Sequence, residues 1–328
     1  MHPLQDNYVV MRYIILGCPY TKMHDLHRAL DDYGLPENIG IINAINIDQI
    51  ASYGIYVGSK LIKFDNFIVS YVRYPYDLIP PHSKNYQLRE ETEFYKSIAL
   101  LFDDIAINRI ASTWALRNRA YSLSLANRFG AKVPPFLLLK DNKQTEIKPA
   151  VKYNNYAVKS IGNCFVSDEI NYNNINKFIS KEEDGGEVAY VFPASLLDNK
   201  ELNEYLSIYN SAFAQMPVYG KAEYRCYFIG GQIIIYEREN ILRFDKSFAS
   251  YYISDHELKS CTYNSIVRIS ESFSIDYVCF DVILDDSGVE WIVDINPYGS
   301  VPPYSTFPEV NSALATRIVE KINKFNDI

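Results

Sequence analysis

Two apolar runs near the C-terminus of this chain, residues 278–284 and 289–295, are separated by four residues that end in glycine. Apolar runs of this length around a short polar loop predict a β-hairpin. If the loop closes tightly, Leu284 pairs with Val289, and the register of every other pair follows from that one. This part of the chain is therefore predicted to be antiparallel β-sheet.

Three polar side chains share one face of this predicted hairpin. In the register that pairs Asp281 with Ile292, the two-residue period of a strand places Asp281, Asp294 and Asn296 on the same side. Two carboxylates and an amide are hard oxygen ligands that suit Mg²⁺, which keeps its other positions for water and phosphate. The alternative is a surface hairpin with solvated acids, but it fits Asp294 poorly, because this acid lies within an apolar run. We therefore predict a magnesium site.

Composition limits the classes of protein that this chain can be. The 328 residues are enough for about two domains, and 48% hydrophobic with 22% charged residues is typical of a soluble globular protein. The net charge of −8 argues against a nucleic-acid partner, because binding to many phosphates requires a basic surface. The five cysteines lack metal-binding spacing, and no segment resembles a signal peptide or is apolar for long enough to cross a membrane. We expect a cytoplasmic protein with no membrane partner.

Residues 1–110 predict a small α/β domain. Short apolar runs, the first at residues 13–17, combine with a helical run at residues 25–33 that ends before Gly34. Arg73 lies at the end of another strand-like run. An arginine there can hold an anion or pair with a nearby acid, and both uses remain open.

The middle of the chain predicts a helix and a strand. Residues 112–129 have the spacing of one long helix that Ser112 could cap. Residues 156–159 predict a short strand that carries Lys159. A lysine on a strand can contact a phosphate as a point charge, although most such lysines are surface residues that extend toward water.

A second predicted hairpin precedes the acidic one. Residues 223–229 and 232–236 are strand-like and are joined by two glycines, which is a good hairpin signal. Glu223 and Arg225 share one side of its first strand by the two-residue period. The simpler interpretation is a plain ion pair, either with a residue on a neighbouring strand or between these two residues, which contributes little at a surface. Arg238 supplies a further cation downstream.

The order of these features resembles that of the ATP-grasp ligases: a strand lysine, a glutamine before a linker with proline, a Glu-x-Arg strand with a glycine hairpin, and an acidic hairpin ending in Asp-Ile-Asn-Pro. The resemblance runs from residue 111 to the C-terminus. It implies an α/β (α+β) fold with three parts: an N-terminal α/β domain at 1–110, a central lid subdomain at 111–215, and a C-terminal antiparallel-sheet subdomain with the metal site at 216–328. It also implies that the cofactors are ATP and Mg²⁺.

The resemblance assigns roles by matching positions. Lys159 resembles the second of two lysines that bind the nucleotide phosphates, and Arg225 resembles an arginine that steadies the transferring phosphate. These two are the expected catalytic residues. Asp281, Asp294 and Asn296 resemble a metal-binding triad that is usually Asp, Glu and Asn, so Asp294 is a shortened version.

The remaining nucleotide contacts are also implied by the resemblance. Gln215 begins a hinge segment whose backbone reads adenine, and Met216 and Val218 continue it. Glu223 and Arg238 are assigned to the same nucleotide site. All five residues are therefore expected in the part of the fold that binds ATP.

The sequence departs from the family pattern in two places. The first nucleotide lysine is expected at the start of a helix, where Arg119 stands, and arginine keeps the charge but changes its geometry. The loop that covers the phosphates is usually rich in glycine, whereas residues 160–164 contain only Gly162. A non-catalytic protein that binds a nucleotide or a peptide in the same cleft is therefore kept as an alternative.

Within the superfamily, the chain most resembles the microviridin-type (graspetide) peptide ligases, which are relatives of the enzyme that adds glutamate to a ribosomal protein. This resemblance rests on the spacing from Gln215 to Arg225, the Glu-x-Arg pair, and an upstream Val-Arg-Tyr-Pro that contains Arg73. It implies a ligase that forms side-chain esters or amides in a precursor peptide through an acyl-phosphate. We expect Arg73 to contact the acceptor. A ligase of free amino acids or dipeptides is the alternative, and a homodimer is left open.

Overall fold

The computed structural model describes residues 11–17, 24–72, 86–140, 155–159, 180–184, 187–191, 195–209, 211–238, 250–297 and 307–326. The chain divides into two compact units. The first contains Met1–Pro75, Glu90–Ile110 and Val301–Ile328, and the second contains Tyr76–Arg89 and Ala111–Ser300. Residues 301–328 thus group with the N-terminal part of the chain, whereas we expected them at the end of a 216–328 subdomain. The boundary at residue 215 stays a prediction.

The first unit contains a three-stranded parallel sheet in the order β2-β1-β6. Its strands are β1 (Arg12–Gly17), β2 (Ile39–Asn43) and β6 (Phe67–Val72). Ile14, Ile15 and Leu16 of the central strand are completely buried, as expected for a parallel strand with both faces covered. A separate antiparallel sheet consists of β3 (Gln49–Ala51), β4 (Gly54–Val57) and β5 (Lys60–Lys63).

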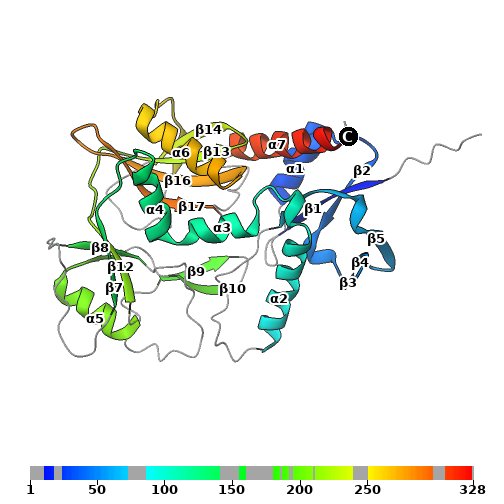
Figure 1. Cartoon of the computed structure of the whole chain (residues 1–328), viewed down its shortest axis with the longest axis horizontal. Helices are drawn as coiled ribbons and strands as arrows, with labels where there is room; N and C mark the ends of the chain where they lie inside the picture. Colours follow the sequence, from blue (N-terminus) through cyan, green and yellow to red (C-terminus); the bar gives the residue numbers. More distant parts are fainter. Residues whose placement is uncertain are drawn as a thin grey trace, which may run out of the picture. The chain divides into compact units, whose positions relative to one another are not determined.

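Helices from the two ends of the chain pack together in the first unit. The helices in this part of the chain are α1 (His24–Tyr33), α2 (Tyr86–Leu101) and α7 (Pro308–Asn326), with the 3-10 helices η1 (Ala44–Asn46), η2 (Phe64–Asn66) and η3 (Asp103–Ile105). Figure 1 shows α7, in red, beside α1, in blue. Gly34 follows α1 with φ of +78°, a left-handed conformation that glycine adopts without steric cost. The predicted helix at 25–33 and strand at 13–17 are both confirmed.

The second unit contains a four-stranded antiparallel sheet in the order β11-β8-β12-β7. Its strands are β7 (Phe136–Lys140), β8 (Tyr156–Lys159), β11 (Ser195–Leu197) and β12 (Ser211–Gln215). Leu202 and Leu206 of α5 (Asn199–Tyr209) form a buried cluster with Tyr156 of β8. A separate hairpin consists of β9 (Ser180–Asp184) and β10 (Glu187–Val191). The strand predicted around Lys159 is therefore β8, an interior strand of this sheet.

A five-stranded antiparallel sheet in the order β15-β14-β13-β16-β17 forms another part of the second unit. Figure 1 labels four of these strands, β14, β13, β16 and β17. Its strands are β13 (Ala222–Ile229), β14 (Gln232–Arg238), β15 (Tyr251–Ile253), β16 (Tyr277–Leu284) and β17 (Glu290–Asn296). Gly230 and Gly231, both with positive φ, connect β13 to β14 as the sequence predicted. Both predicted hairpins are therefore present, and the expected C-terminal antiparallel sheet is confirmed.

The prediction of a single helix at residues 112–129 is wrong, because the helix is interrupted at Asn118. Three further helices of the chain are α3 (Ile110–Arg117), α4 (Arg119–Arg128) and α6 (Ser260–Ser272). The side chain of Asn118 accepts a hydrogen bond of 3.0 Å from the N–H of Tyr121 and so caps α4. An asparagine that bonds to the backbone in this way competes with a continuous helix. Arg119 is consequently the first residue of α4.

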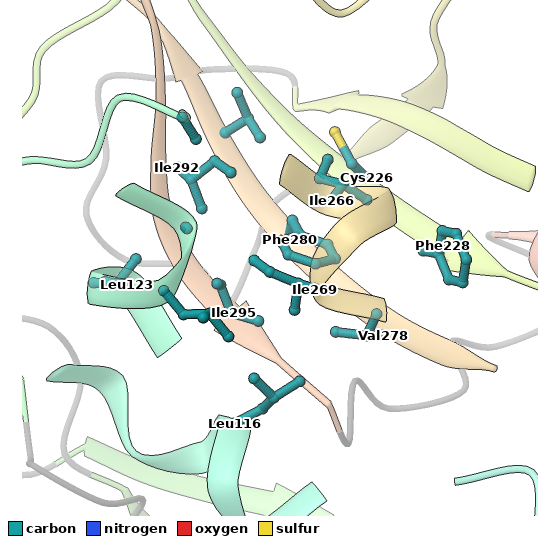
Figure 2. Close-up of a cluster of buried hydrophobic side chains, with 14 of the residues drawn as sticks. Leu116, Leu123, Cys226, Phe228, Ile266, Ile269, Val278, Phe280, Ile292 and Ile295 are labelled. Atoms are coloured by element: carbon teal, nitrogen blue, oxygen red, sulfur yellow. The ribbon is translucent and has the colours of Figure 1, made fainter. Parts of the chain in front are cut away.

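Helices α4 and α6 cover one face of the five-stranded sheet. Figure 2 shows Leu123 of α4 and Ile269 of α6 in one cluster with Phe280 of β16 and Ile292 of β17. All four side chains are completely buried, and burial of one such side chain contributes about 2 kcal/mol before the entropy of ordering is counted. Because side chains alternate along a strand, Asp281 lies on the opposite face of the sheet.

The β16–β17 hairpin has a different register from the predicted one. Asp285 donates its N–H to the carbonyl of Val289, so the loop shrinks to three residues that end at Gly288, with φ of +79°. Leu284 consequently pairs with Glu290 and not with Val289. A left-handed glycine at the end of a tight turn is a common way to close a three-residue loop.

A β-bulge in β17 compensates for this shift. The register changes between Asp281 and Val282, and Asp281 pairs with Asp294 instead of the predicted Ile292. A shift of one residue turns every later side chain to the other face. The loop and the bulge each shift the register by one, so Asp294 stays on the face of Asp281. The bulge also lets Ile292 and Ile295, three residues apart, both enter the core.

No helix in the part of the chain that the structure describes is long and apolar enough to cross a membrane.

Candidate functional site

Charged side chains from adjacent strands gather on the face of the five-stranded sheet opposite α4 and α6. The register places Arg225 of β13 directly opposite Asp281 of β16, and Asp281 directly opposite Asp294 of β17. Directly opposed residues have Cβ atoms about 5 Å apart. These three side chains therefore form a row across the sheet, which we call the charged row.

Arg225 and Asp281 form an ion pair at the centre of the charged row. Nε of Arg225 lies 3.1 Å from Oδ1 of Asp281, and its guanidinium carbon lies 4.9 Å from the ring centre of Tyr251. Burial is the largest single effect and disfavours the charged guanidinium, but the carboxylate of Asp281 and weaker interactions with Cys279, Tyr227 and Tyr251 together outweigh it and hold the pKa of Arg225 well above its ordinary value. Arg225 therefore stays charged in the folded protein.

Asp294, at the end of the charged row, is contacted by cations from two distant parts of the chain. Nε of Arg119 lies 3.3 Å from Oδ1 of Asp294, and Nζ of Lys159 lies 4.0 Å from Oδ2. Lys159 also donates a hydrogen bond of 3.0 Å to the carbonyl of Val293. Val293 is the bulged residue, which has no partner residue in the register with β16. The bulge thus supplies Lys159 with a backbone acceptor.

Glu223 and Arg238 form a second ion pair on the same face. Nη1 of Arg238 lies 2.8 Å from Oε2 of Glu223, and their side chains are only 3% and 10% exposed. The simpler interpretation of the sequence was a plain ion pair, either across strands or between Glu223 and Arg225 along β13. The structure brings Glu223 to the next strand, β14, while Arg225 contacts Asp281.

The predicted hinge residues lie at the end of the four-stranded sheet. Gln215 is the last residue of β12, in the strand next to the one that carries Lys159. Its side chain is buried, and Nε2 has no hydrogen-bond partner among the described residues. Met216 donates its N–H to the carbonyl of Pro135 at 2.9 Å, and Val218 is half-buried. A buried amide group without a partner is costly, so Nε2 of Gln215 is a donor available to a ligand.

Two carboxylates and one amide are the candidate metal ligands. Asp281 is buried, Asp294 is half-buried and Asn296 is exposed at the end of β17. Within the described ranges, no group of three or more His, Cys, Asp or Glu side chains could hold a metal ion. A metal here would therefore use Asp281, Asp294 and Asn296 and complete its shell with water or phosphate oxygens, which is the way in which proteins usually bind Mg²⁺.

Some predicted site residues lie outside the described residues, and some contacts were not predicted. Arg73 and the loop at 160–164 fall in the first group. The ring of Tyr251 and the carbonyl of Val293 fall in the second. Nothing in the sequence distinguishes Tyr251 from the other tyrosines of the chain, and a backbone carbonyl has no signature of its own.

The structure is similar to solved ATP-grasp ligases over almost the whole chain. A RiPP-associated ATP-grasp ligase from Chryseobacterium gregarium, in complex with ADP and a leader and core peptide, has a TM-score of 0.69 at 12% identity, over 95% of this chain and 97% of that one. The macrocyclase MdnC from Microcystis aeruginosa, bound with the precursor peptide MdnA, has a TM-score of 0.66 at 17% identity, over 94% and 100%. The ATP-grasp ligase PsnB, complexed with a minimal precursor, Mg and ADP, has a TM-score of 0.62 at 14% identity, over 95% and 98%. No family model and no curated protein matches the sequence.

These similarities show that the chain has the ATP-grasp fold. The fold that the order of sequence features predicted is therefore confirmed. At 12% to 17% identity the similarity concerns the fold, so the roles of individual residues rest on the contacts described above.

Proposed function

We propose that this chain is an ATP-dependent ligase that joins a carboxylate to an amine or a hydroxyl group of a peptide. The observation that supports it is the charged row, Arg225, Asp281 and Asp294, with Arg119 and Lys159 against its end. Phosphoryl transfer requires cations that neutralise phosphate oxygens and carboxylates that hold Mg²⁺. Cations alone would suit an anion, and carboxylates alone would suit a metal ion. This site combines cations with carboxylates.

The proposed cofactors are ATP and Mg²⁺, and the residues present fit them. The orphan Nε2 of Gln215 is a donor for the nucleotide, and Arg119 and Lys159 are cations for its phosphates. The facing carboxylates of Asp281 and Asp294 are the anionic metal ligands. When bound, Mg²⁺ neutralises and polarises the phosphoryl oxygens. Similar ligases have been solved with ADP and with Mg and ADP.

The charges of the site suit an acyl-phosphate route. A carboxylate is a poor electrophile, so in the proposed reaction its oxygen attacks the γ-phosphorus of ATP, and ADP leaves. Arg225, which stays charged beside Asp281, would stabilise the transferring phosphoryl group, while Lys159 would hold the phosphates of the nucleotide. An amine or hydroxyl then attacks the acyl carbon, phosphate leaves and the nucleophile loses its proton, which produces an amide or an ester.

We propose that the acceptor is a ribosomally made precursor peptide. Similar ATP-grasp ligases have been solved with precursor peptides bound. Arg73 remains our candidate contact for an acidic side chain of the acceptor, although it lies outside the described residues. Arg73→Ala should raise the KM for the acceptor and leave ATP affinity without acceptor unchanged. The thiol of Cys226, which is buried and in no disulfide, fits the proposed cytoplasmic location.

The proposal is tested by combining the protein with ATP, Mg²⁺ and candidate precursor peptides translated from short reading frames beside its gene. ADP release is followed with a coupled assay, and the peptide is followed by mass spectrometry. We expect one ADP per bond formed and a loss of one water mass per bond. Mild alkali or hydroxylamine opens esters and leaves amides, which identifies the product. Asp281→Asn is the inactive control.

Each other outcome selects a different function. Dehydration of free amino acids but not of peptides would make the chain a small-molecule ligase. Binding of ATP with Mg²⁺ but no ADP release with any carboxylate would make it a non-catalytic binding protein. ADP release without any change in peptide mass would leave only an ATPase, and the ligase proposal would then be abandoned.

A further inference from the structure

Every carboxylate described in the candidate site is contacted by a cation of the same chain. Arg225 contacts Asp281 at 3.1 Å, Arg119 contacts Asp294 at 3.3 Å, and Lys159 lies 4.0 Å from the second oxygen of Asp294. Carboxylate oxygens that face cations at these distances are poorly placed to bind a divalent metal, because the metal would share the oxygens with another positive group. The metal ligands and the phosphate ligands of the proposed site are thus bound to each other.

The charge balance of these ion pairs favours anions over metal ions. The cations are Arg119, Lys159, Arg225 and Arg238, and the carboxylates are Asp281, Asp294 and Glu223. Four cations against three carboxylates leave a net charge of +1 within this set. A divalent cation that enters alone raises this charge, whereas the phosphates of a nucleotide reverse it.

We propose that Arg119 and Lys159 impose an order of binding, in which the nucleotide binds first and the metal second. The phosphates draw both cations away from Asp294, and only then does its carboxylate become a metal ligand. This inference rests on the proposed function of the same site, because it assumes that Asp294 is a ligand of Mg²⁺. It adds that Arg119 and Lys159 protect Asp294 from metal when no nucleotide is present.

The contacts of Lys159 suit this exchange. Its 3.0 Å hydrogen bond goes to the neutral carbonyl of Val293, and its contact with Asp294 is at 4.0 Å. An ammonium group forms a stronger bond to a charged phosphate oxygen than to a neutral carbonyl. Lys159 can therefore turn to a phosphate and give up its two present contacts. Arg119, as the first residue of α4, has a backbone held by the Asn118 cap, so only its side chain has to move.

The test uses Mn²⁺ alone as the probe, with no nucleotide and no acceptor. Mn²⁺ accepts the same oxygen ligands as Mg²⁺, and its free fraction is measured by electron paramagnetic resonance. The variants are Arg119→Gln and Lys159→Gln. The matched control is Arg128→Gln, which removes an exposed positive charge from the same helix, about 14 Å farther along its axis. Thermal unfolding confirms that each variant is folded.

We expect the wild type and Arg128→Gln to bind Mn²⁺ weakly. Arg119→Gln and Lys159→Gln should each bind it roughly ten-fold more tightly or better, because one cation no longer occupies Asp294. Adding Asp294→Asn to Arg119→Gln should remove the gain, which locates it at this carboxylate. In EDTA, the wild type should still bind ADP, and each single variant should bind it more weakly.

The proposal is overturned if both glutamine variants bind Mn²⁺ no more tightly than Arg128→Gln, whether that binding is weak or strong. If one of the two variants does not fold, the other decides. The experiment needs no turnover, so its outcome is distinct from that of the ligase assay. If the protein ligates a peptide but binds Mn²⁺ before the nucleotide, the proposed order of binding is overturned and the ligase proposal stands. Ordered binding without ligation would overturn the ligase proposal alone.

Discussion

Replacing Asp294 by asparagine separates a metal ligand from a structural acid. The amide is almost the same size as the carboxylate, so packing in β17 is kept while the charge is lost. The carboxylate attracts Arg119 at 3.3 Å and Lys159 at 4.0 Å. With an effective dielectric constant of about 20, these attractions are about 5 and about 4 kcal/mol before any solvation cost is subtracted.

Solvation removes most of that energy. The side chains of Arg119, Lys159 and Asp294 are 15%, 14% and 21% exposed, and each charge regains water when its partner is lost. Partly exposed ion pairs therefore have a net value of about 1 kcal/mol. We expect Asp294→Asn to change the free energy of unfolding by about this amount, measured by urea denaturation.

The effect on turnover should be much larger. A lost metal ligand removes several kcal/mol of transition-state stabilisation, and about 2.7 kcal/mol already corresponds to a hundred-fold loss of kcat. We expect a decrease of at least that size in ADP release with an acceptor present. Asp286→Asn, in the exposed loop of the same hairpin, is the control and should leave both kcat and stability unchanged. Near-normal turnover by Asp294→Asn would refute the metal assignment, and an unfolded variant would make Asp294 structural.

Three further predictions follow from individual contacts. Lys159→Met should mainly weaken nucleotide binding, because Lys159 holds phosphates in the ground state. Arg225→Met should mainly lower kcat, because Arg225 stabilises the transferring group. Equal effects of the two variants on KM and kcat in steady-state kinetics would contradict this division. Glu223→Gln should lower the free energy of unfolding in urea by about 3 kcal/mol, since the guanidinium of Arg238 is buried against this carboxylate. Glu257→Gln, at an exposed position, is the control and should leave the free energy of unfolding unchanged. Hydrogen bonds from Ser287, Trp291 and the N–H of Val289 lower the pKa of Asp285 to about 2. The carboxylate of Asp285 therefore stabilises the fold at pH values above its unfolded pKa of about 3.9, and this stabilisation is lost as the pH falls to about 2. Wild type and Asp285→Asn should therefore differ in stability near pH 5 and converge near pH 2, and a difference that grows on acidification would refute the assignment.

Much of the site could be predicted from the sequence because it depends on local order. Alternation along β17 is enough to place Asp294 and Asn296 on one face, and two glycines are enough to predict the β13–β14 turn. Asp281 shares that face because the loop and the bulge each shift the register by one residue. The order of these elements was enough to predict the ATP-grasp fold. Each of these inferences uses only neighbours along the chain, and the structure confirms the two hairpins and the fold.

The register of the acidic hairpin could be read only in part. The predicted pairs were wrong by one residue at Leu284 and by two at Asp281. The tight loop that ends at the left-handed Gly288 shifts the pairing by one residue, and the bulge shifts it by one more. Ile292 and Ile295, three apart within a strand, were a sign of the bulge, since a regular strand would direct them to opposite faces. The sequence does not show which face each isoleucine takes, because the core that buries both is built by α4 and α6.

The sequence by itself determined the two hairpins, the first strand and helix, and the set of charged residues available to the site. Only the tertiary structure decided which charges meet. Arg119 and Asp294 are 175 residues apart and belong to different elements, and Lys159 reaches Val293 across 134 residues. Periodicity and turn chemistry act over a few residues, whereas an ion pair depends on the distance between two side chains after the whole unit has packed. For that reason the sequence could name the cations and the carboxylates, and only the folded chain shows that they hold each other.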